Sequence, residues 1–323
     1  MTGSQIRGVG VYRPARIVYN DEICGPIDST DEWIRKRSGI VSRRFAAPKD
    51  TVVSMAAEAG AAALRHAGAT AAGVDVVIVA TMSYLYQSPP AGPQVAELIG
   101  ATRAAAFDVG AACTGFCSAL AVADGLVSAG SARRVLVIGS ERMTDIIDPK
   151  DRSTAFLFAD GAGAVVVERS ADRGIHPVAW AADGTRSGVI GHEDSWLASR
   201  DDPGFWPVMR MAGQEVFRWA ISEVTPIALE AVRSAGLTVA DLAAFVPHQA
   251  NIRIIDRIAA GLKLPAGVVV SHDVEHSGDT SAASIPLALD SLISANRVPA
   301  GGLALLSGFG AGLSQASMVV RLP

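Results

Sequence analysis

One cysteine stands at the start of a predicted apolar helix. Cys113 follows a short apolar strand that ends near Val109, and apolar residues then recur at helical spacing from Phe116 to Leu126. The unpaired N–H groups and the positive dipole end at the start of a helix favour a thiolate over a thiol. Cys113 is therefore a candidate nucleophile. The alternative is a small buried apolar side chain, the usual role of a free cysteine, and this stretch alone leaves both interpretations open.

Three other segments carry polar or glycine-rich patterns that suit the surroundings of a nucleophile. They are His248 after the apolar run Leu242–Pro247, the segment 276–284 around Asp279, and the turn 308–312. Three of the four segments follow or flank apolar strands. Their residues can therefore gather at one end of the predicted sheets, where open α/β folds place their sites.

The composition limits the class of protein. The chain has 323 residues, of which 50% are hydrophobic and 32 are glycines, and this suits a tightly packed α/β interior. The formal net charge of −4 provides no bulk attraction to nucleic acid or to an anionic membrane. No apolar run approaches the ~20 residues that cross a bilayer, and Met1–Arg16 lacks the form of a signal peptide. We therefore expect a soluble cytoplasmic protein.

Cysteine usage agrees with a reducing compartment. Cys24, Cys113 and Cys117 are too few for a disulfide framework. Cys113 and Cys117 are four positions apart, but no second Cys/His pair has the spacing of metal ligands. No metal site is expected.

Apolar runs and glycine positions predict a repeated α/β unit. Val74–Ala80 is a continuous apolar run, typical of a strand buried on both faces, and a helix is expected over Thr280–Asn296. The glycines of 159–163 predict a turn that leads into another strand. The order of buried strand, loop, Gly-x-Gly turn and apolar strand in 132–168 recurs in 300–321, which indicates a duplication.

Five motifs along the chain carry a family resemblance. They are DEWIRKRSGI at 31–40, ACTGF at 112–116, FADGAG at 158–163, PHQAN at 247–251 and TSAASIP at 280–286. In this order and spacing they resemble β-ketoacyl-acyl-carrier-protein synthase III, a family of thiolase-like condensing enzymes, over essentially the whole chain. The resemblance implies an α/β thiolase-like fold of two duplicated βαβαβ-type halves in a five-layered α-β-α-β-α arrangement. The first half would span 1–170 and carry Cys113, and the second would span 171–323 and carry His248 and Asp279.

The resemblance also implies a reaction. Cys113 would accept an acyl group from acyl-CoA, and a decarboxylative Claisen reaction with malonyl-acyl carrier protein would follow, in fatty acid or polyketide initiation. His248 would polarise the second thioester, and the backbone N–H groups of Cys113 and Ala311 would form the oxyanion hole. Acyl-CoA is a substrate in this scheme, and no permanently bound cofactor is expected.

Further positions match residues that the family uses for binding. Trp33 and Arg37 correspond to the clamp on the adenine of CoA, helped by Arg152, although ordinary packing is the alternative for Trp33. The other expected CoA-binding residues are Met211, Gly213, Phe217, Ala250 and Asn251. A basic rim for the acidic acyl carrier protein would consist of Arg218, Arg253 and Arg257, whose alternative role is that of solvated surface residues.

Asp279 departs from the family pattern, which has asparagine there. An ionised carboxylate only accepts hydrogen bonds and cannot stabilise a developing enolate as an amide can. Either Asp279 is protonated in a dry pocket, or it belongs to a Cys-His-Asp triad that moves the acyl group to a hydroxyl or amine. We rank condensation first. A non-catalytic partner subunit is disfavoured because Cys113 and His248 are both present.

Two connections have expected roles at interfaces. The loop Tyr84–Pro90 matches the segment that reaches the neighbour's acyl pocket in the family's dimer, and its small polar tip would leave room for longer or branched primers. A homodimer is expected, since the strand before Asp108 would otherwise be an unpaired edge. The connection 182–213 is long enough to be a functional cover or binding wall.

Overall fold

Two five-stranded sheets with the same strand order make up the computed structural model, which describes residues 3–323. The first sheet has the order β1 (Gly3–Tyr12), β7 (Asp160–Ser170), β6 (Arg134–Arg142), β4 (Val76–Ala80), β5 (Ala105–Val109). The second has the order β8 (Ala179–Ala182), β14 (Ser314–Arg321), β13 (Leu303–Gly310), β11 (Ala244–Pro247), β12 (Val269–Val270). In both sheets the first three strands are antiparallel and the last three are parallel. The two halves therefore share one topology.

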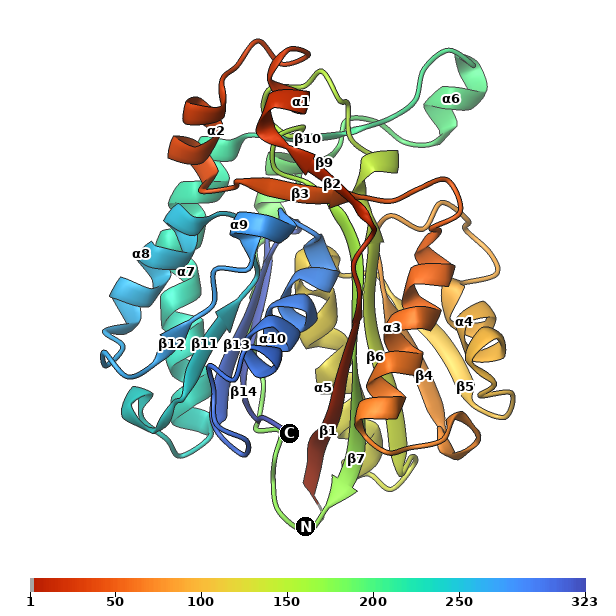
Figure 1. Ribbon diagram of the computed structural model, residues 1–323, viewed down its shortest axis with the longest axis vertical. Coiled ribbons are helices and arrows are strands. Elements are labelled where there is room, and N and C mark those ends of the chain that lie inside the picture. Colours follow the sequence, from red (N-terminus) through yellow and green to blue (C-terminus); the bar gives the residue numbers. More distant parts are fainter. Residues whose placement is uncertain (1–2) are drawn as a thin grey trace.

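Helices outside and between the two sheets complete a five-layered arrangement (Figure 1). The helices are α3 (Val52–His66) and α4 (Ala91–Ile99) outside the first sheet, α5 (Gly115–Ser128) and α10 (Ser284–Ser294) between the sheets, and α7 (Gly213–Ser234) and α8 (Ile252–Leu262) outside the second. This arrangement confirms the predicted thiolase-like α-β-α-β-α fold. The division at residue 170 stays a prediction.

Alternating side chains of β4 explain how a sheet comes to lie between two helical layers. Val76, Ile78 and Ala80 pack into the core that contains α5 and α10, whereas Val77 and Val79 pack under α3 and α4. Burial of each of these valine and isoleucine side chains stabilises the fold by about 1.5–3 kcal/mol. Both faces of this strand are therefore apolar, as its uninterrupted sequence predicted.

The glycine turn expected over 159–163 is wrong, because Gly161 and Gly163 both lie within strand β7. Helix α10 crosses this part of β7 closely. A Cβ at Gly163 would stand 2.8 Å from Pro286, and one at Gly161 would stand 3.2 Å from Leu287. The glycines make space for a neighbouring helix. The sequence pattern alone does not distinguish such close packing from a turn.

The helix expected over Thr280–Asn296 begins later than predicted. A 3₁₀ turn occupies Ser281–Ala283, and α10 starts at Ser284. The corresponding place in the first half has the same form, since the 3₁₀ turn Ala112–Thr114 leads into α5. Ala112 and Ser281 both have a left-handed backbone, with φ of 43° and 47°. Two sharp turns thus face each other at the centre of the molecule.

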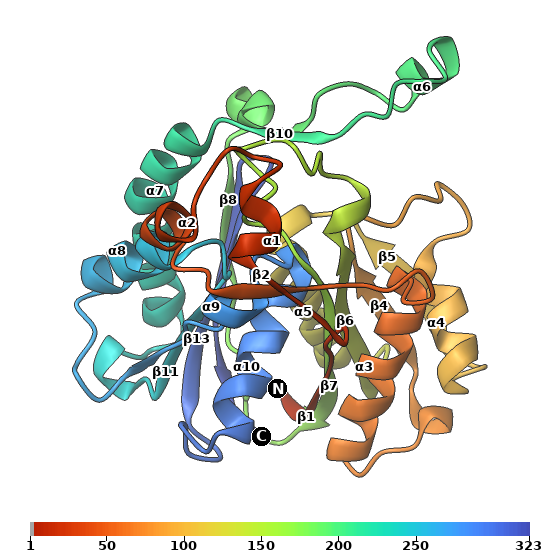
Figure 2. The same ribbon diagram turned by 45° about the horizontal axis from the view of Figure 1, so that its top comes forward.

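Smaller elements lie over one end of the two sheets (Figure 2). They are β2 (Arg16–Tyr19), β3 (Ser42–Phe45), α1 (Asn20–Cys24), α2 (Asp31–Ser38), β9 (Ile190–His192), β10 (Met209–Met211) and α9 (Val274–Ser277). Between β9 and β10, helix α6 (Leu197–Asp201) projects away from the body in both views. None of the helices within residues 3–323 is long and apolar enough to cross a membrane.

Candidate active site

A cavity of about 690 Å³ brings together Cys113, His248 and Asp279. Each residue comes from a different turn: Cys113 from the 3₁₀ turn before α5, His248 from the end of β11, and Asp279 from the connection between α9 and α10. All three side chains are buried. The structure therefore collects the three residues from both halves of the chain.

Cys113 lies two residues before α5, close to the predicted position at its first turn. Gly310 approaches it from the end of β13, because a Cβ at Gly310 would stand 2.8 Å from the Cys113 Sγ. Any side chain at 310 would thus displace the thiol. Gly310 lines the cavity, whereas Ala311 follows it in the turn and is not part of the lining. The predicted oxyanion role of Ala311 therefore depends on its backbone N–H alone.

The other two cysteines have different surroundings. Cys117 is fully buried, and burial raises the pKa of its thiol to about 12, although the Gly308 N–H partly opposes this. Burial likewise raises the pKa of Cys24, which is half-buried. Neither lines the cavity. Both observations support a structural role for these thiols.

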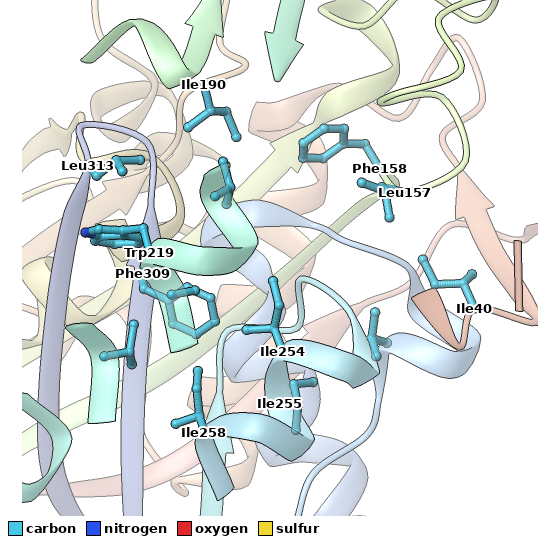
Figure 3. Packing of buried hydrophobic residues seen from close by; sticks show 14 of the residues in the cluster. Ile40, Leu157, Phe158, Ile190, Trp219, Ile254, Ile255, Ile258, Phe309 and Leu313 are labelled. Carbon is cyan, nitrogen blue, oxygen red and sulfur yellow. The ribbon is translucent and has the colours of Figure 1, made fainter. Parts of the chain in front are cut away.

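His248 is held from three sides. Its Nδ1 is 2.8 Å from the hydroxyl of Ser284, its backbone N–H donates to the Ser307 carbonyl, and the ring of Phe309 meets it edge-on at 5.3 Å. Figure 3 shows Phe309 in the hydrophobic cluster with Trp219. The imidazole is therefore fixed by the second-half core.

Charge on the Nε2 side sets the protonation of His248. Burial opposes its protonation, but the negative charges of Asp279 and Cys113 outweigh burial and raise the pKa of His248 to about 10. The imidazolium is thus the stable form at neutral pH, and it is lost only as the pH rises through about 10. An imidazolium donates from both nitrogens, through Nδ1 to Ser284 and through Nε2 toward the cavity.

Asp279 lies on the same side of the imidazole as Cys113. Its Oδ2 is 3.5 Å from Nε2 of His248, and its Oδ1 accepts a 2.8 Å hydrogen bond from the Ser281 N–H. A catalytic triad instead places the carboxylate at the nitrogen that faces away from the nucleophile. Here Ser284 takes that position. The geometry therefore does not form the linear Cys-His-Asp triad considered from the sequence.

Aromatic and basic side chains form the outer part of the cavity. The guanidinium groups of Arg37 and Arg152 lie 5.0 Å and 4.7 Å from the centre of the Trp33 ring. Phe156 meets Trp33 edge-on at 5.1 Å, so the indole is also packed, as the alternative interpretation of this residue expects. A flat base stacks well on such a group of aromatic and guanidinium planes.

The remaining predicted binding residues divide into two groups. Those that line the cavity are Met211, Gly213, Phe217, Arg218, Ala250, Asn251 and Arg253. Asn251 has a structural task as well, because its side chain accepts from the Ile254 N–H and caps α8. Arg257 is exposed on α8 and is not part of the lining.

Sequence reasoning missed two residues that contact His248, and one buried carboxyl elsewhere in the first half. Ser284 lies inside the motif at 280–286, but nothing in that motif shows that its hydroxyl meets His248. Phe309 belongs to the glycine-rich turn segment without an assigned role. Glu141, a fully buried carboxyl at the end of β6, follows an apolar run without any signal of its own.

Comparisons with known proteins agree with the geometry. The family model for 3-oxoacyl-[acyl-carrier-protein] synthase III matches residues 107–184, and the model for its C-terminal part matches residues 232–322. The β-ketoacyl-[acyl-carrier-protein] synthase III of Streptomyces lividans is 51% identical over 99% of this chain and 95% of its own length. A mycobacterial β-ketoacyl-[acyl-carrier-protein] synthase III from Mycobacterium avium (strain 104) is 47% identical over 100% of this chain and 96% of its own length.

Solved structures give the same result. The priming β-ketosynthase from the R1128 polyketide biosynthetic pathway is 51% identical, with a TM-score of 0.98 over 99% of this chain and 96% of that chain. The 3-oxoacyl-[acyl-carrier-protein] synthase III from Aquifex aeolicus VF5 is 36% identical, with a TM-score of 0.91 over 99% and 100% of the two chains.

Proposed function

This chain belongs to the 3-oxoacyl-[acyl-carrier-protein] synthase III family, and on that premise we propose that Cys113, His248 and Asp279 form its active site. The enzyme is a condensing acyltransferase that joins an acyl-CoA starter to malonyl-acyl carrier protein, as in fatty acid or polyketide synthesis. The observation that carries the assignment is the gathering of the three side chains in one cavity, with Asp279 Oδ2 3.5 Å from His248 Nε2.

The first half-reaction transfers the acyl group to Cys113. Its thiolate sulfur bonds to the acyl carbonyl carbon, the C–S bond to CoA breaks, and CoA leaves with that electron pair. The His248 imidazolium stabilises the thiolate before the attack. The N–H groups of Cys113 and of the turn after Gly310 stabilise the oxyanion.

The second half-reaction uses the same imidazolium as a donor. The C–CO₂ bond of the malonyl group breaks, and its electron pair forms an enolate that accepts from His248 Nε2–H. The enolate carbon bonds to the acyl carbon on Cys113, and the C–S bond breaks with its electrons returning to sulfur. The product is a 3-ketoacyl thioester, and no resident metal or cofactor takes part in this scheme.

Asp279 then acts through His248. Its negative charge helps to keep the imidazole protonated, so His248 supplies a donor that Asp279 itself lacks. Acyl transfer to a hydroxyl or amine requires His248 as a base. The raised pKa and the place of Asp279 at Nε2 disfavour this alternative.

Product analysis tests the proposal. The protein is mixed with malonyl-acyl carrier protein and with acetyl-CoA or longer acyl-CoAs, and the products are identified by mass spectrometry. We expect a 3-ketoacyl-acyl carrier protein and one CO₂ per turnover. Acyl esters or amides formed without CO₂ release would instead establish the transferase alternative.

We predict that Trp33→Ala weakens binding of acyl-CoA. Loss of the stacking surface should raise the KM for acyl-CoA about tenfold, since contacts between cations and aromatic rings contribute on the order of 1 kcal/mol. Acylation by a short thioester without CoA should change little. Trp180→Ala is the matched control, because Trp180 is exposed on β8 and outside the cavity lining. Equal losses with both donors would show that Trp33 holds the fold rather than CoA.

Two interactions with other proteins complete the proposal. The exposed arginines Arg218 and Arg253 line the cavity, and with Arg257 they suit the acidic carrier protein and its phosphopantetheine. A homodimer is supported by β5, an edge strand of the first sheet on which Phe107 is exposed. Light scattering that gives a monomer at micromolar concentration would exclude the dimer.

A further inference from the structure

A single arginine beside the cavity holds three carboxylates together. The guanidinium nitrogens of Arg210 lie 3.4 Å from Asp148, 3.1 Å from Asp151 and 2.9 Å from Glu193, measured to the nearest carboxylate oxygen. Within residues 3–323, no other Lys, Arg or His side chain forms an ion pair with these carboxylates. Arg210 is not part of the cavity lining, and the reaction outlined above does not use it.

The two aspartates belong to the turn 148–154, which carries Arg152. Asp151 Oδ1 accepts from the Ser153 N–H at 2.8 Å, and its Oδ2 accepts from the Thr154 hydroxyl at 3.1 Å. Burial raises the pKa of this carboxyl, but its hydrogen bonds, among them the one from Arg210, outweigh burial and lower the pKa below its ordinary value. The ionised Asp151 side chain therefore organises the turn on both sides of Arg152.

The third carboxylate and Arg210 belong to the two-stranded ribbon of β9 and β10. Glu193 directly follows β9, and its N–H donates to the Val208 carbonyl. Along β10, Met209 is buried, Arg210 is exposed and Met211 lines the cavity, because side chains alternate along a strand. Arg210 thus joins the turn 148–154 to the outer face of a ribbon whose inner face is part of the cavity wall.

Loss of this arginine would replace attraction with repulsion. Three carboxylates would remain together without a cation between them, and like charges at this spacing repel one another. A single exposed ion pair contributes little to stability, whereas several charges that share one partner can fix a local geometry. The ribbon itself would stay attached, because the Met209 N–H donates to the Ile146 carbonyl, before the turn. We therefore expect the turn to move while the fold remains.

Arg152 depends on this turn for its place in the site. Its guanidinium lies 4.7 Å from the centre of the Trp33 ring, and the guanidinium of Arg37 lies 5.0 Å from the same centre. No Asp or Glu side chain of the described part of the chain forms an ion pair with either arginine. Two cations beside one ring repel each other, so the backbone of the turn must keep Arg152 there.

We propose that Arg210 is a positioning residue for acyl-CoA binding, because its ion pairs hold the turn that places Arg152 over Trp33. The inference rests on the proposed function, in which Trp33 and Arg152 belong to the binding site for CoA. Because Arg210 contacts neither the cavity nor the reacting atoms, the chemistry at Cys113 itself is expected to be independent of it.

Kinetics with two acyl donors test the proposal. Arg210→Gln should raise the KM for acyl-CoA roughly fivefold to tenfold, as loss of a contact between a cation and an aromatic ring does, and leave kcat within about twofold. Acylation of Cys113 by a short thioester without CoA should also stay within about twofold of wild type. Arg210→Lys keeps the charge but lacks the planar group that contacts several carboxylates, so its KM should lie between those of wild type and Arg210→Gln.

A double variant separates positioning from direct attraction of the anionic CoA. If Arg210 acts through Arg152, adding Arg210→Gln to Arg152→Ala should raise the KM by less than about twofold. An arginine that attracted CoA from a distance would instead multiply the two effects. A triple variant with Arg210→Gln, Asp148→Asn and Glu193→Gln removes two of the repelling charges and should recover part of the lost affinity.

Arg186→Gln is the matched control. Arg186 belongs to the same connection, pairs with Asp183 at 3.2 Å and is outside the cavity lining. Its side chain is 52% exposed, against 43% for Arg210, so both variants lose one exposed cation of similar accessibility. Arg186→Gln should leave the kinetics with both donors unchanged. The thermal midpoint of every variant is measured alongside.

The outcomes that would overturn the role of Arg210 are distinct. They are an unchanged KM in Arg210→Gln, multiplied effects in the double variant, no recovery in the triple variant, or equal losses with both donors and a lower thermal midpoint. If Arg210→Gln fails to fold, Arg210→Lys is compared in the same way, alone and with Arg152→Ala. If Trp33→Ala and Arg152→Ala both leave the KM for acyl-CoA unchanged, the CoA site of the proposed function is wrong, and the Arg210 proposal falls with it.

Discussion

Cys113→Ala is expected to abolish acyl-enzyme formation from acyl-CoA. Cys113 is the cysteine that lines the cavity, and the imidazolium of His248 stabilises its thiolate. Loss of the serine nucleophile of a protease costs on the order of 10⁶ in kcat, and a loss of similar size is expected here. Intact-protein mass spectrometry after incubation with acyl-CoA should show one acyl group on the wild type and none on the variant.

Cys117→Ala provides the matched control for that experiment. Burial raises the pKa of Cys117 to about 12, so its thiol remains protonated and out of reach of the substrate. This variant should still carry one acyl group. An adduct on any other residue of Cys113→Ala would mean that the nucleophile is assigned wrongly.

Asp279→Asn is expected to accelerate the second half-reaction. The amide adds a donor for the developing enolate and removes a negative charge that repels the malonyl carboxylate. We expect this gain to exceed the loss of the charge that helps to keep His248 protonated. Because one oxyanion-type donor contributes on the order of 10²–10³ in rate, a rise of about tenfold in malonyl decarboxylation and 3-ketoacyl product is a conservative expectation. Both quantities are measured with malonyl-acyl carrier protein on the acylated enzyme.

The same substitution separates the two chemistries by the sign of its effect. If the enzyme transferred the acyl group to a hydroxyl or amine, loss of the carboxylate would take away a partner of His248, and transfer would collapse while acylation of Cys113 survived. A variant that changes neither half-reaction would place Asp279 outside the chemistry. That outcome would show that the contact between Asp279 and His248 has no function in the reaction.

The local pattern of apolar residues was sufficient to predict the strands and helices that carry the site residues. The uninterrupted run at Val74–Ala80 predicted a strand buried on both faces, and apolar spacing after Cys113 predicted a buried helix. The repeated order of strands and glycine turns predicted two similar halves, and the two sheets share one strand order. These features depend on residues that are close in sequence. The spacing of apolar residues and the local composition therefore predict them directly.

Other features depend on how the two halves pack. The glycines of 161–163 looked like a turn, but they admit α10, a helix more than a hundred residues away. The placement of Asp279 at Nε2 and Ser284 at Nδ1 follows from the left-handed Ser281 turn beside the end of β11. The close approach of β6 to that turn joins the two halves of the chain, since a Cβ at Gly139 would stand 2.3 Å from the Ala282 carbonyl oxygen.

The motifs around Cys113, His248 and Asp279 therefore specified which chemical groups are present and near which elements they stand. Only the packed structure decided which nitrogen of His248 each partner meets. The physical reason is that hydrogen bonding and charge interaction depend on distances of a few ångströms between residues distant in sequence. Such distances arise when the two sheets close on α5 and α10, and no local periodicity encodes them.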